Sequence, residues 1–166
     1  YALSLPDYNA LHTWSVQQPA LFWQALCEFF TIQFDTPAEQ VLNHYTDMLS
    51  AQWFSGAHFN FAQQLLSRRD QHLALICINE NKQRLALSYA ELYQAVAQCA
   101  AGLKTIGIQP GDRVAGLLPN SHYAVIAMLA TASLGAIWSS CSPDFGAQAA
   151  IDRLGQIEPK ALFICD

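Results

Sequence analysis

Runs of hydrophobic residues separated by polar turns recur at regular intervals from about residue 72 onward. Between residue 88 and the last of these runs, longer apolar segments with helical spacing separate one run from the next. Strands that are buried on both faces read as continuous apolar runs, so this alternation predicts a parallel sheet in an α/β fold. The predicted strands are residues 73–78, 84–87, 114–118, 136–139 and 161–165.

The most specific local signal is a predicted helix start at Ser88-Tyr-Ala-Glu91. It has the form of a capping box, in which the side chains of Ser88 and Glu91 each satisfy a free backbone N–H of the other residue. Gly107 is predicted to end this helix. Apolar residues at steps of three and four are predicted to share its buried face, namely Leu92, Val96, Cys99, Leu103 and Ile106.

Two further helices are predicted toward the end of the chain. Asn120 or Ser121 caps the first, which is apolar nearly all round. Ser142, Pro143 and Asp144 open the second, directly after a predicted strand. Because ligands of open α/β sheets bind beyond the carboxyl ends of the strands, this turn is also a candidate lining of a pocket.

The first part of the chain has a different texture, rich in aromatic residues and without regular apolar spacing. A helix is predicted over residues 20–30 with Pro19 in its first turn, and Asn60 is predicted to cap a short helix. Sequence of this kind commonly packs over another domain. We therefore predict a mostly helical, aromatic-rich N-terminal extension at residues 1–70. The incomplete first subdomain of a parallel-sheet domain is predicted to follow at residues 71–166.

The composition predicts that further polypeptide covers part of the surface of this chain. Only 13% of the residues are charged, against about 25% in typical soluble proteins. The chain also begins with Tyr1 rather than Met and closes on an apolar run, which favours a fragment of a longer protein. The net charge is −5 and no basic stripe is present, so nucleic acid is not a predicted partner.

The five cysteines form no Cys-x-x-Cys pair and are mostly set in apolar runs. We interpret them as small buried residues of a cytoplasmic protein, in a reducing compartment. No signal peptide is recognised. The uncharged stretch at residues 114–143 is broken near Pro119, and the remainder is shorter than the ~20 apolar residues of a spanning helix. No membrane partner is therefore predicted.

Motifs that carry chemistry are scarce. The sequence has no G-x-x-x-x-G-K-[ST] phosphate loop, no G-x-G-x-x-G, no G-x-S-x-G elbow and no H-E-x-x-H. The five histidines are too dispersed to place two ligands on one metal ion. We therefore predict neither a catalytic residue nor a metal site within these residues.

The stretch LGAIWSSCSPDFG at residues 134–146 resembles a signature of acetoacetyl-CoA synthetases, members of the adenylate-forming (AMP-binding) superfamily. Three further stretches are also similar to this family, although the family usually has Pro where the third of them carries Ser55. The resemblance covers essentially the whole chain. The three stretches are LKTIGIQPGDRVAGLLPN (103–120), DRLGQIEPKALF (152–163) and WFSGAHFNFAQQLL (53–66).

The resemblance implies a ligase that joins a carboxylic acid to ATP, giving an acyl-AMP and pyrophosphate, and then transfers the acyl group to CoA. The implied cofactors of the full-length enzyme are ATP, CoA and Mg²⁺, and the implied acid is acetoacetate. The family's phosphate loop, its adenine and magnesium motifs and its catalytic lysine would all lie beyond residue 166. The fragment alone is therefore expected to be inactive and to bind none of these ligands.

One site within the chain is also implied. In acetyl-CoA synthetases, the loop aligned with Ser142, Pro143 and Asp144 lies near the CoA adenine and contacts it largely through its backbone. Those enzymes typically carry Phe-Gly-Gly at these positions and His in place of Trp138. The departure favours the acetoacetyl branch, and the three residues are the predicted CoA-site loop.

Two alternatives remain open from the sequence. The chain could come from an acetyl- or propionyl-CoA synthetase, or from another short-chain acyl-CoA ligase, because nothing in it is assigned to the acyl group. It could also be a stand-alone binding module. The sparse charge and the unfinished predicted sheet argue against the module.

Overall fold

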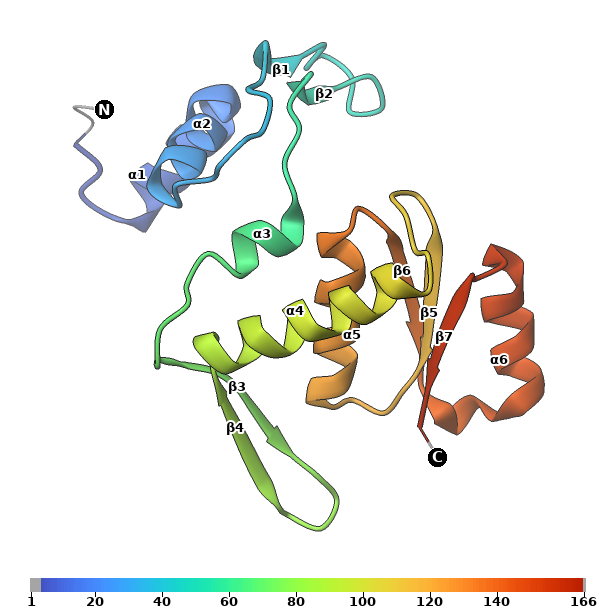
Figure 1. The fold of residues 1–166 in the computed structure, drawn as a ribbon. Helices are drawn as coiled ribbons and strands as arrows, with labels where there is room; N and C mark the ends of the chain where they lie inside the picture. The colour runs from blue at the N-terminus through green and yellow to red at the C-terminus, as the bar shows by residue number, and fades with distance from the viewer. Residues whose placement is uncertain (1–3, 166) are drawn as a thin grey trace. The chain divides into compact units, whose positions relative to one another are not determined.

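The computed structural model describes residues 4–165, which fall into two compact units (Figure 1). The first unit ends at Phe59 and the second begins at Asn60. Residues 1–3 and 166, at the outer ends of the two predicted domains, lie outside the described part. The change in composition near residue 70 comes later than the division between the units, and a short helix lies between the two points.

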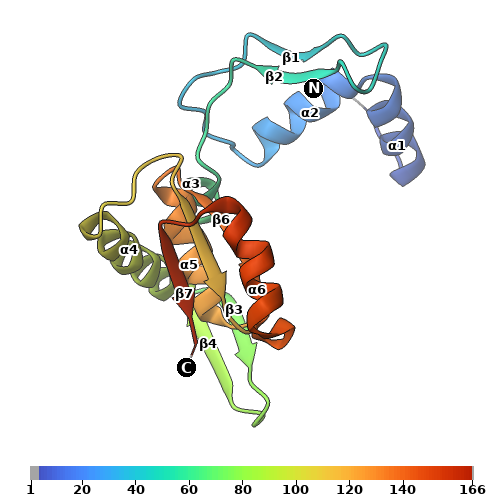
Figure 2. The same cartoon turned by 90° about the vertical axis from the view of Figure 1, so that its right-hand side faces the viewer.

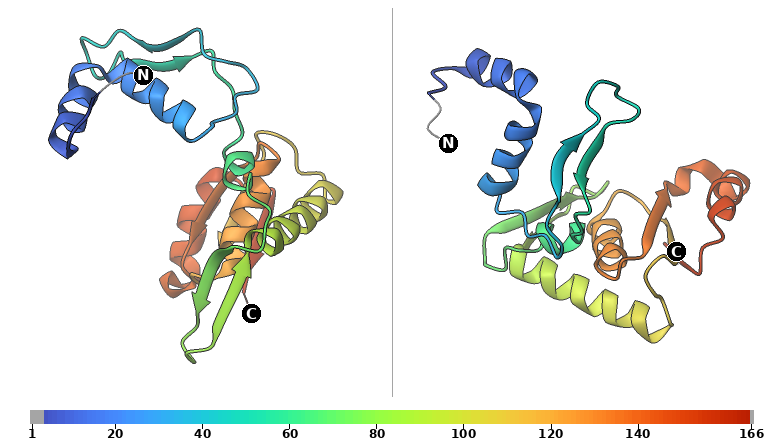
Figure 3. Two further views of the ribbon diagram at one scale, coloured as in Figure 1. Left: turned by 90° about the vertical axis from the view of Figure 1, so that its left-hand side faces the viewer. Right: turned by 90° about the horizontal axis from the view of Figure 1, so that it is seen from above.

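Helices α1 (Tyr8–Gln17) and α2 (Pro19–Phe29) open the first unit, drawn in blue in Figure 3. Strands β1 (Gln40–Asn43) and β2 (Gln52–Ser55) follow as an antiparallel hairpin. The helix predicted after a proline is confirmed as α2. Helix α1 and the hairpin were not predicted. The signal for α1 is Asp7, whose side chain accepts a hydrogen bond from the Ala10 N–H at 2.8 Å.

Aromatic side chains of the first unit pair with one another without forming a buried centre. Trp14 and Phe22 meet edge to face with ring centroids 5.7 Å apart, and Trp23 and Trp53 do so at 5.9 Å. No residue between 4 and 59 is fully buried, and Phe29 is 79% exposed. The described residues of the first unit therefore have no fully buried core.

The second unit begins with α3 (Phe61–Leu65) and an antiparallel hairpin of β3 (Leu73–Ile78) and β4 (Arg84–Ser88). The predicted cap of α3 is confirmed, because the Asn60 side chain accepts a hydrogen bond from the Gln63 N–H at 3.0 Å.

A three-stranded parallel sheet lies at the centre of the rest of the second unit, in the order β6-β5-β7. Helices α4 and α5 lie on one side of it and α6 on the other (Figures 1 and 2). The predicted α/β fold with a small parallel sheet is therefore confirmed. The elements are α4 (Tyr89–Thr105), β5 (Arg113–Leu117), α5 (His122–Ser133), β6 (Ile137–Cys141), the 3₁₀ turn η1 (Pro143–Phe145), α6 (Gly146–Leu154), the 3₁₀ turn η2 (Gly155–Ile157) and β7 (Ala161–Ile164).

The core of the second unit lies between α4, α5 and one face of the sheet. Of the predicted face of α4, three residues are fully buried: Leu92, Val96 and Leu103. Cys99 is half-buried, and Ile106, at 62% exposed, is the one error. Ile106 is the C-cap, and Gly107 with φ 84° turns the chain away there, so its side chain no longer shares the buried face.

The side chain of Trp138 on β6 approaches the backbone of β5 closely, on the face of the sheet that packs against α4 and α5. Trp138 of β6 lies level with Val114 of β5, and its indole reaches along β5 to Gly116. A Cβ atom built on Gly116 would lie 2.5 Å from Cη2 of Trp138. Phe163 of β7 follows on the other side, with its ring centroid 6.0 Å from that of Trp138. Glycine is therefore required at this point of the central strand.

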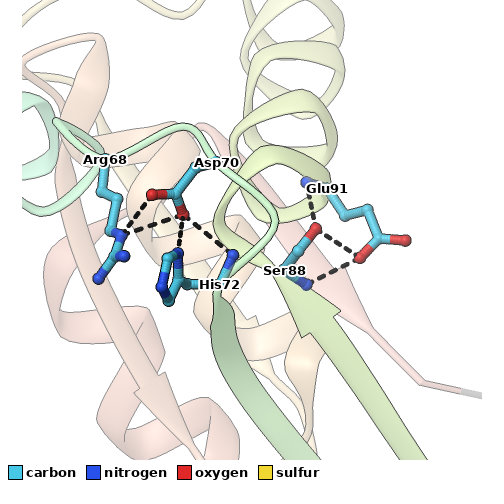
Figure 4. A network of polar contacts seen from close by, with 5 residues as sticks. All are labelled: Arg68, Asp70, His72, Ser88 and Glu91. Carbon is cyan, nitrogen blue, oxygen red and sulfur yellow. Dashed lines mark hydrogen bonds and ion pairs between the residues drawn. The ribbon is translucent and has the colours of Figure 1, made fainter.

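The capping box at the start of α4 is confirmed (Figure 4). The Ser88 N–H donates to Glu91 Oε2 at 2.7 Å, and Ser88 Oγ accepts from the Glu91 N–H at 3.2 Å. Ser121 stands at the predicted N-cap of α5 but makes no capping bond, and within the described residues its buried Oγ has no hydrogen-bond partner.

Replacing Ser88 by alanine is expected to lower the free energy of unfolding by about 0.5–2 kcal/mol at pH 7. The bonds from the Ser88 N–H and hydroxyl lower the pKa of the Glu91 carboxyl, so their contribution is present above the ordinary pKa of glutamate, about 4.3. It is lost as the pH falls through the lowered folded-state pKa. Urea unfolding of the unchanged protein and of Ser88→Ala, at pH 7 and near pH 3, measures the loss of stability at each pH.

The matched control is Ser121→Ala, which removes a hydroxyl from the equivalent position of α5. It is expected to change stability little at either pH, because no capping bond is lost. Equal losses for the Ser88 and Ser121 variants at pH 7 would contradict the role of the capping box.

Candidate functional site

The carboxyl ends of the three parallel strands meet at one edge of the sheet. Leu117 of β5 pairs with Cys141 of β6 on one side and with Ile164 of β7 on the other, so the strands end level with one another. Ligands of open α/β sheets bind beyond this kind of edge. The segments that follow the strands are therefore the candidate site.

The turn after β6 holds the three residues predicted from the sequence. Ser142 Oγ accepts a hydrogen bond from the Asp144 N–H at 3.3 Å and donates one to Asp144 Oδ2 at 2.7 Å. The Phe145 N–H donates to the Ser142 carbonyl at 3.4 Å. Ser142 and Pro143 are half-buried, whereas Asp144 is exposed. The turn therefore exposes the Asp144 carboxylate to solvent, and the two hydrogen bonds between Asp144 and Ser142 are made within the turn.

One structural expectation for this turn was wrong. Ser142, Pro143 and Asp144 do not open the helix themselves but open the 3₁₀ turn η1, and helix α6 begins only at Gly146. The cause is the backbone of Gly146, with φ 71°, a left-handed value that interrupts the helical path. The turn is thus a separate element between strand and helix.

The side chain of Arg153, near the C-terminal end of α6, contacts Phe145, the last residue of η1. Its guanidinium carbon lies 3.9 Å from the centroid of the Phe145 ring, in cation–π geometry. Neither residue was singled out from the sequence as a site residue. No local signal marks the pair, because a separation of eight residues does not place two side chains on neighbouring turns of one helix.

A charge pair lies at the opposite end of the parallel strands, where β5 and β7 begin. Lys160, just before β7, donates to Asp112 Oδ2 at 2.8 Å, and Asp112 precedes β5. The hydrogen bonds from the Lys160 side chain and from the Gln109 N–H lower the pKa of the Asp112 carboxyl. This pair joins two strand beginnings and has no part in the candidate site.

A second charged group lies in the loop before β3 (Figure 4). Asp70 accepts hydrogen bonds from Arg68 Nε at 2.8 and 3.0 Å and from the His72 N–H at 3.0 Å, and the Arg68 bonds lower the pKa of its carboxyl. The carbonyls of Asp70 and His72 accept the N–H groups of Ala90 and Tyr89, each at 2.9 Å. The network thus satisfies free N–H groups at the start of α4, which is a structural role.

Three cavities lie against the sheet, and none of them is lined by residues 142–144. One, of about 620 Å³, lies at the carboxyl edge between α4, α5 and the ends of β5 and β7, and Pro119 and Ser121 contribute to it. Another, of about 330 Å³, separates α6 from Leu117 and is almost entirely apolar. The third, of about 360 Å³, lies between α4 and β7. The predicted loop therefore stands at an exposed rim and not inside a cavity.

Within residues 4–165, no three His, Cys, Asp or Glu side chains are grouped so that they could hold a metal ion. In the same part of the chain, no helix is long and apolar enough to cross a membrane.

Comparison with known families places this sheet and its rim in a defined class. Residues 61–166 match the AMP-binding enzyme family, and residues 8–65 match the acetyl-coenzyme A synthetase N-terminus family. The chain therefore belongs to the AMP-binding enzyme family.

Its relatives within that family point to one group. The chain is 43% identical over 166 residues to an acetoacetyl-coenzyme A synthetase of Rhizobium meliloti (strain 1021), covering 100% of this chain and 25% of that protein. It is 39% identical over 170 residues to a malonamoyl-CoA synthetase of Penicillium aethiopicum, covering 98% and 24%. The first comparison confirms the resemblance to acetoacetyl-CoA synthetases over the whole chain.

The fold agrees with a solved structure of the same group. The structure of acetoacetyl-CoA synthetase from Streptomyces lividans superposes with a TM-score of 0.87 at 44% identity, covering 98% of this chain and 26% of that one. The chain thus spans about a quarter of the length of the relatives that it matches.

Proposed function

We propose that the intact protein is a ligase that converts acetoacetate, ATP and CoA to acetoacetyl-CoA, AMP and pyrophosphate through an acyl-AMP. The observation that carries this proposal is the 43% identity to an acetoacetyl-coenzyme A synthetase along the entire chain. The segment from Trp138 to Phe145, which departs from acetyl-CoA synthetases, supports the same choice of acid.

A second acid is supported by the relative from Penicillium aethiopicum, named as a malonamoyl-CoA synthetase. Malonamate and acetoacetate both carry a carbonyl on the third carbon, and they differ by an amide nitrogen in place of a methyl group. The substrate class that both relatives favour is thus a short acid with a carbonyl at the third carbon.

The residues of this chain are not proposed to perform the chemical step. No phosphate-binding loop occurs in the sequence, so ATP and Mg²⁺ are assigned to residues outside it. The proposed compartment is the cytoplasm, supported by the five cysteines, which are free thiols in the described structure. Small molecules are the proposed partners.

We assign the turn at Ser142, Pro143 and Asp144 to the CoA site of the intact enzyme. The turn leaves the carboxyl end of β6, and its Asp144 is exposed at the edge where such sheets bind ligands. The competing interpretation is structural, since the bond between Ser142 and Asp144 holds the turn without any ligand. The position at the rim, outside the cavities that lie against the sheet, fits a large substrate that enters from solvent.

The overall reaction is tested with the purified intact protein, acetoacetate, ATP, Mg²⁺ and CoA. We expect a CoA thioester, AMP and pyrophosphate in equal amounts, each measured by chromatography. Formation of ADP and phosphate, or the absence of a thioester, would overturn the proposal.

The CoA assignment is tested with Asp144→Ala in the intact protein. We expect the KM for CoA to rise about two- to tenfold, the equivalent of one lost hydrogen bond, because the turn loses the carboxylate that Ser142 holds. Acetoacetate-dependent pyrophosphate exchange reports the first half-reaction alone and is expected to stay nearly constant.

Asp152→Ala is the matched control, since it removes an exposed carboxylate from α6 outside the turn. It is expected to leave the KM for CoA unchanged. If pyrophosphate exchange and the melting temperature of Asp144→Ala fall together with CoA affinity, the residue only supports the turn and the CoA assignment is wrong.

A further inference from the structure

Phe145 and Arg153 connect the rim turn to the far end of the helix that follows it. Phe145 is the last residue of η1, directly after Asp144, and its ring is half-exposed. Arg153 lies in the last turn of α6, and its guanidinium carbon is 3.9 Å from the ring centroid. The contact therefore joins the last turn of the helix to the residue directly before its start.

The turn has few other constraints. It is a single 3₁₀ turn. Its internal bonds are those between Ser142 and Asp144, the bond of 3.4 Å from the Phe145 N–H to the Ser142 carbonyl, and the bond from the Gly146 N–H to the Pro143 carbonyl. The next residue is Gly146, which has open space around its Cα and a left-handed φ of 71°. Glycine has the widest choice of backbone conformations, so the residue that joins the turn to α6 restrains the backbone less than any other residue type would.

We propose that Arg153 is a positioning residue for CoA: by stacking on Phe145 it holds the Ser142–Asp144 turn in the shape that receives the nucleotide end of CoA. This inference rests on the CoA site proposed above. A guanidinium suits the role because it is planar, always charged and able to stack on an aromatic face. The side chain acts through Phe145 and does not itself contact the reacting atoms.

The test uses Arg153→Met in the intact enzyme. Methionine keeps an unbranched apolar stem against the ring and removes the planar charge. The KM for CoA is expected to rise about two- to fivefold, the value of a partly exposed cation–π contact, with kcat and pyrophosphate exchange unchanged. Arg153→Lys is expected to restore part of the affinity, because an ammonium also attracts the face of the ring.

The substrate 3′-dephospho-CoA separates positioning from direct contact. If Arg153 positions the turn, its loss raises the KM for CoA and for 3′-dephospho-CoA by the same factor. A rise for CoA alone would mean that the guanidinium binds the 3′-phosphate directly, and the proposed role would be wrong. Arg84→Met, which removes the same exposed charge from β4, is the control and is expected to change neither KM.

The outcomes also distinguish the proposed role of Arg153 from the assignment of the turn to the CoA site. If Asp144→Ala raises the KM for CoA and Arg153→Met does not, the turn belongs to the CoA site and the role of Arg153 is refuted. If neither variant changes this KM, the CoA site itself is wrongly assigned. If Arg153→Met lowers the melting temperature and pyrophosphate exchange along with CoA affinity, the contact is only structural and the proposal fails.

Discussion

Replacing Gly116 by valine is expected to cost more stability than any other single change discussed for this chain. Valine is a favoured strand residue, so its propensity alone would stabilise β5. However, the first atom of any side chain at Gly116 would lie 2.5 Å from Cη2 and 2.7 Å from Cζ2 of Trp138. The indole is rigid and half-buried, so either the ring or the central strand must move. Overpacking of this kind costs about 1–3 kcal/mol, and Gly116→Ala is expected to fall in this range and Gly116→Val at or above its upper end.

Gly102→Ala is the matched control for this prediction. Gly102 lies within α4, and a Cβ there would have no neighbour within 4 Å. Alanine is therefore expected to stabilise the protein by about 0.5–1 kcal/mol. Combining Gly116→Ala with Trp138→Phe removes the clashing ring edge and should recover part of the loss. If urea unfolding shows the same stability for Gly116→Ala and Gly102→Ala, the close approach does not constrain the sequence.

The intact protein is expected to use acetoacetate at least tenfold more efficiently than acetate, as measured by kcat/KM. Acetate lacks the third carbon with its carbonyl and the terminal methyl group. A site that encloses these groups gains contacts that acetate cannot make, and even one missing methylene costs about 10–200-fold in enzymes that discriminate by size. Malonamate, with an amide nitrogen in place of the methyl group, is expected to rank between the two if the protein is specific for acetoacetate.

Butyrate separates recognition of the carbonyl from recognition of length, because it has the same chain length as acetoacetate without the carbonyl. We expect butyrate to be a poorer substrate than acetoacetate, since a buried donor meant for the carbonyl would be left unpaired. A preference for malonamate would favour the second acid. A preference for acetate would refute the whole substrate class.

Signals between near neighbours in the sequence predicted most elements of the second unit. The capping box at Ser88 and Glu91 and the strand Leu73–Ile78 are present as predicted. Capping depends on residues three positions apart, and a strand of this kind depends on a continuous apolar run, so both can be recognised without knowledge of the fold. The first unit was less predictable, because β1 and β2 are only four residues long and their pairing depends on the loop between them.

The segment after β6 was predictable in position but not in form. A serine and a proline after an apolar run predicted a helix start at the end of β6, whereas the structure has the 3₁₀ turn η1 there. That Gly146 would take a left-handed φ, and so separate this turn from α6, depends on where the helix must lie against the sheet. The contact between Arg153 and Phe145 has the same origin, since it depends on how η1 and α6 are oriented relative to each other.

In the second unit, the sequence therefore predicted which segments would be strands and helices, and it also predicted the family resemblance of the whole chain. The arrangement of the segments had to come from the tertiary structure. Strand order β6-β5-β7 joins segments that are distant along the chain, and their register places Trp138 beside Val114, from where its indole reaches Gly116. From the sequence alone, a serine at a helix start cannot be assigned as a cap. Ser88 makes capping bonds, whereas the hydroxyl of Ser121 is buried without a bond in the described structure. The physical reason is range: caps and periodic faces involve atoms within four residues of one another. Strand pairing, close ring contacts and the burial of a hydroxyl are decided by atoms that meet only after the chain has folded.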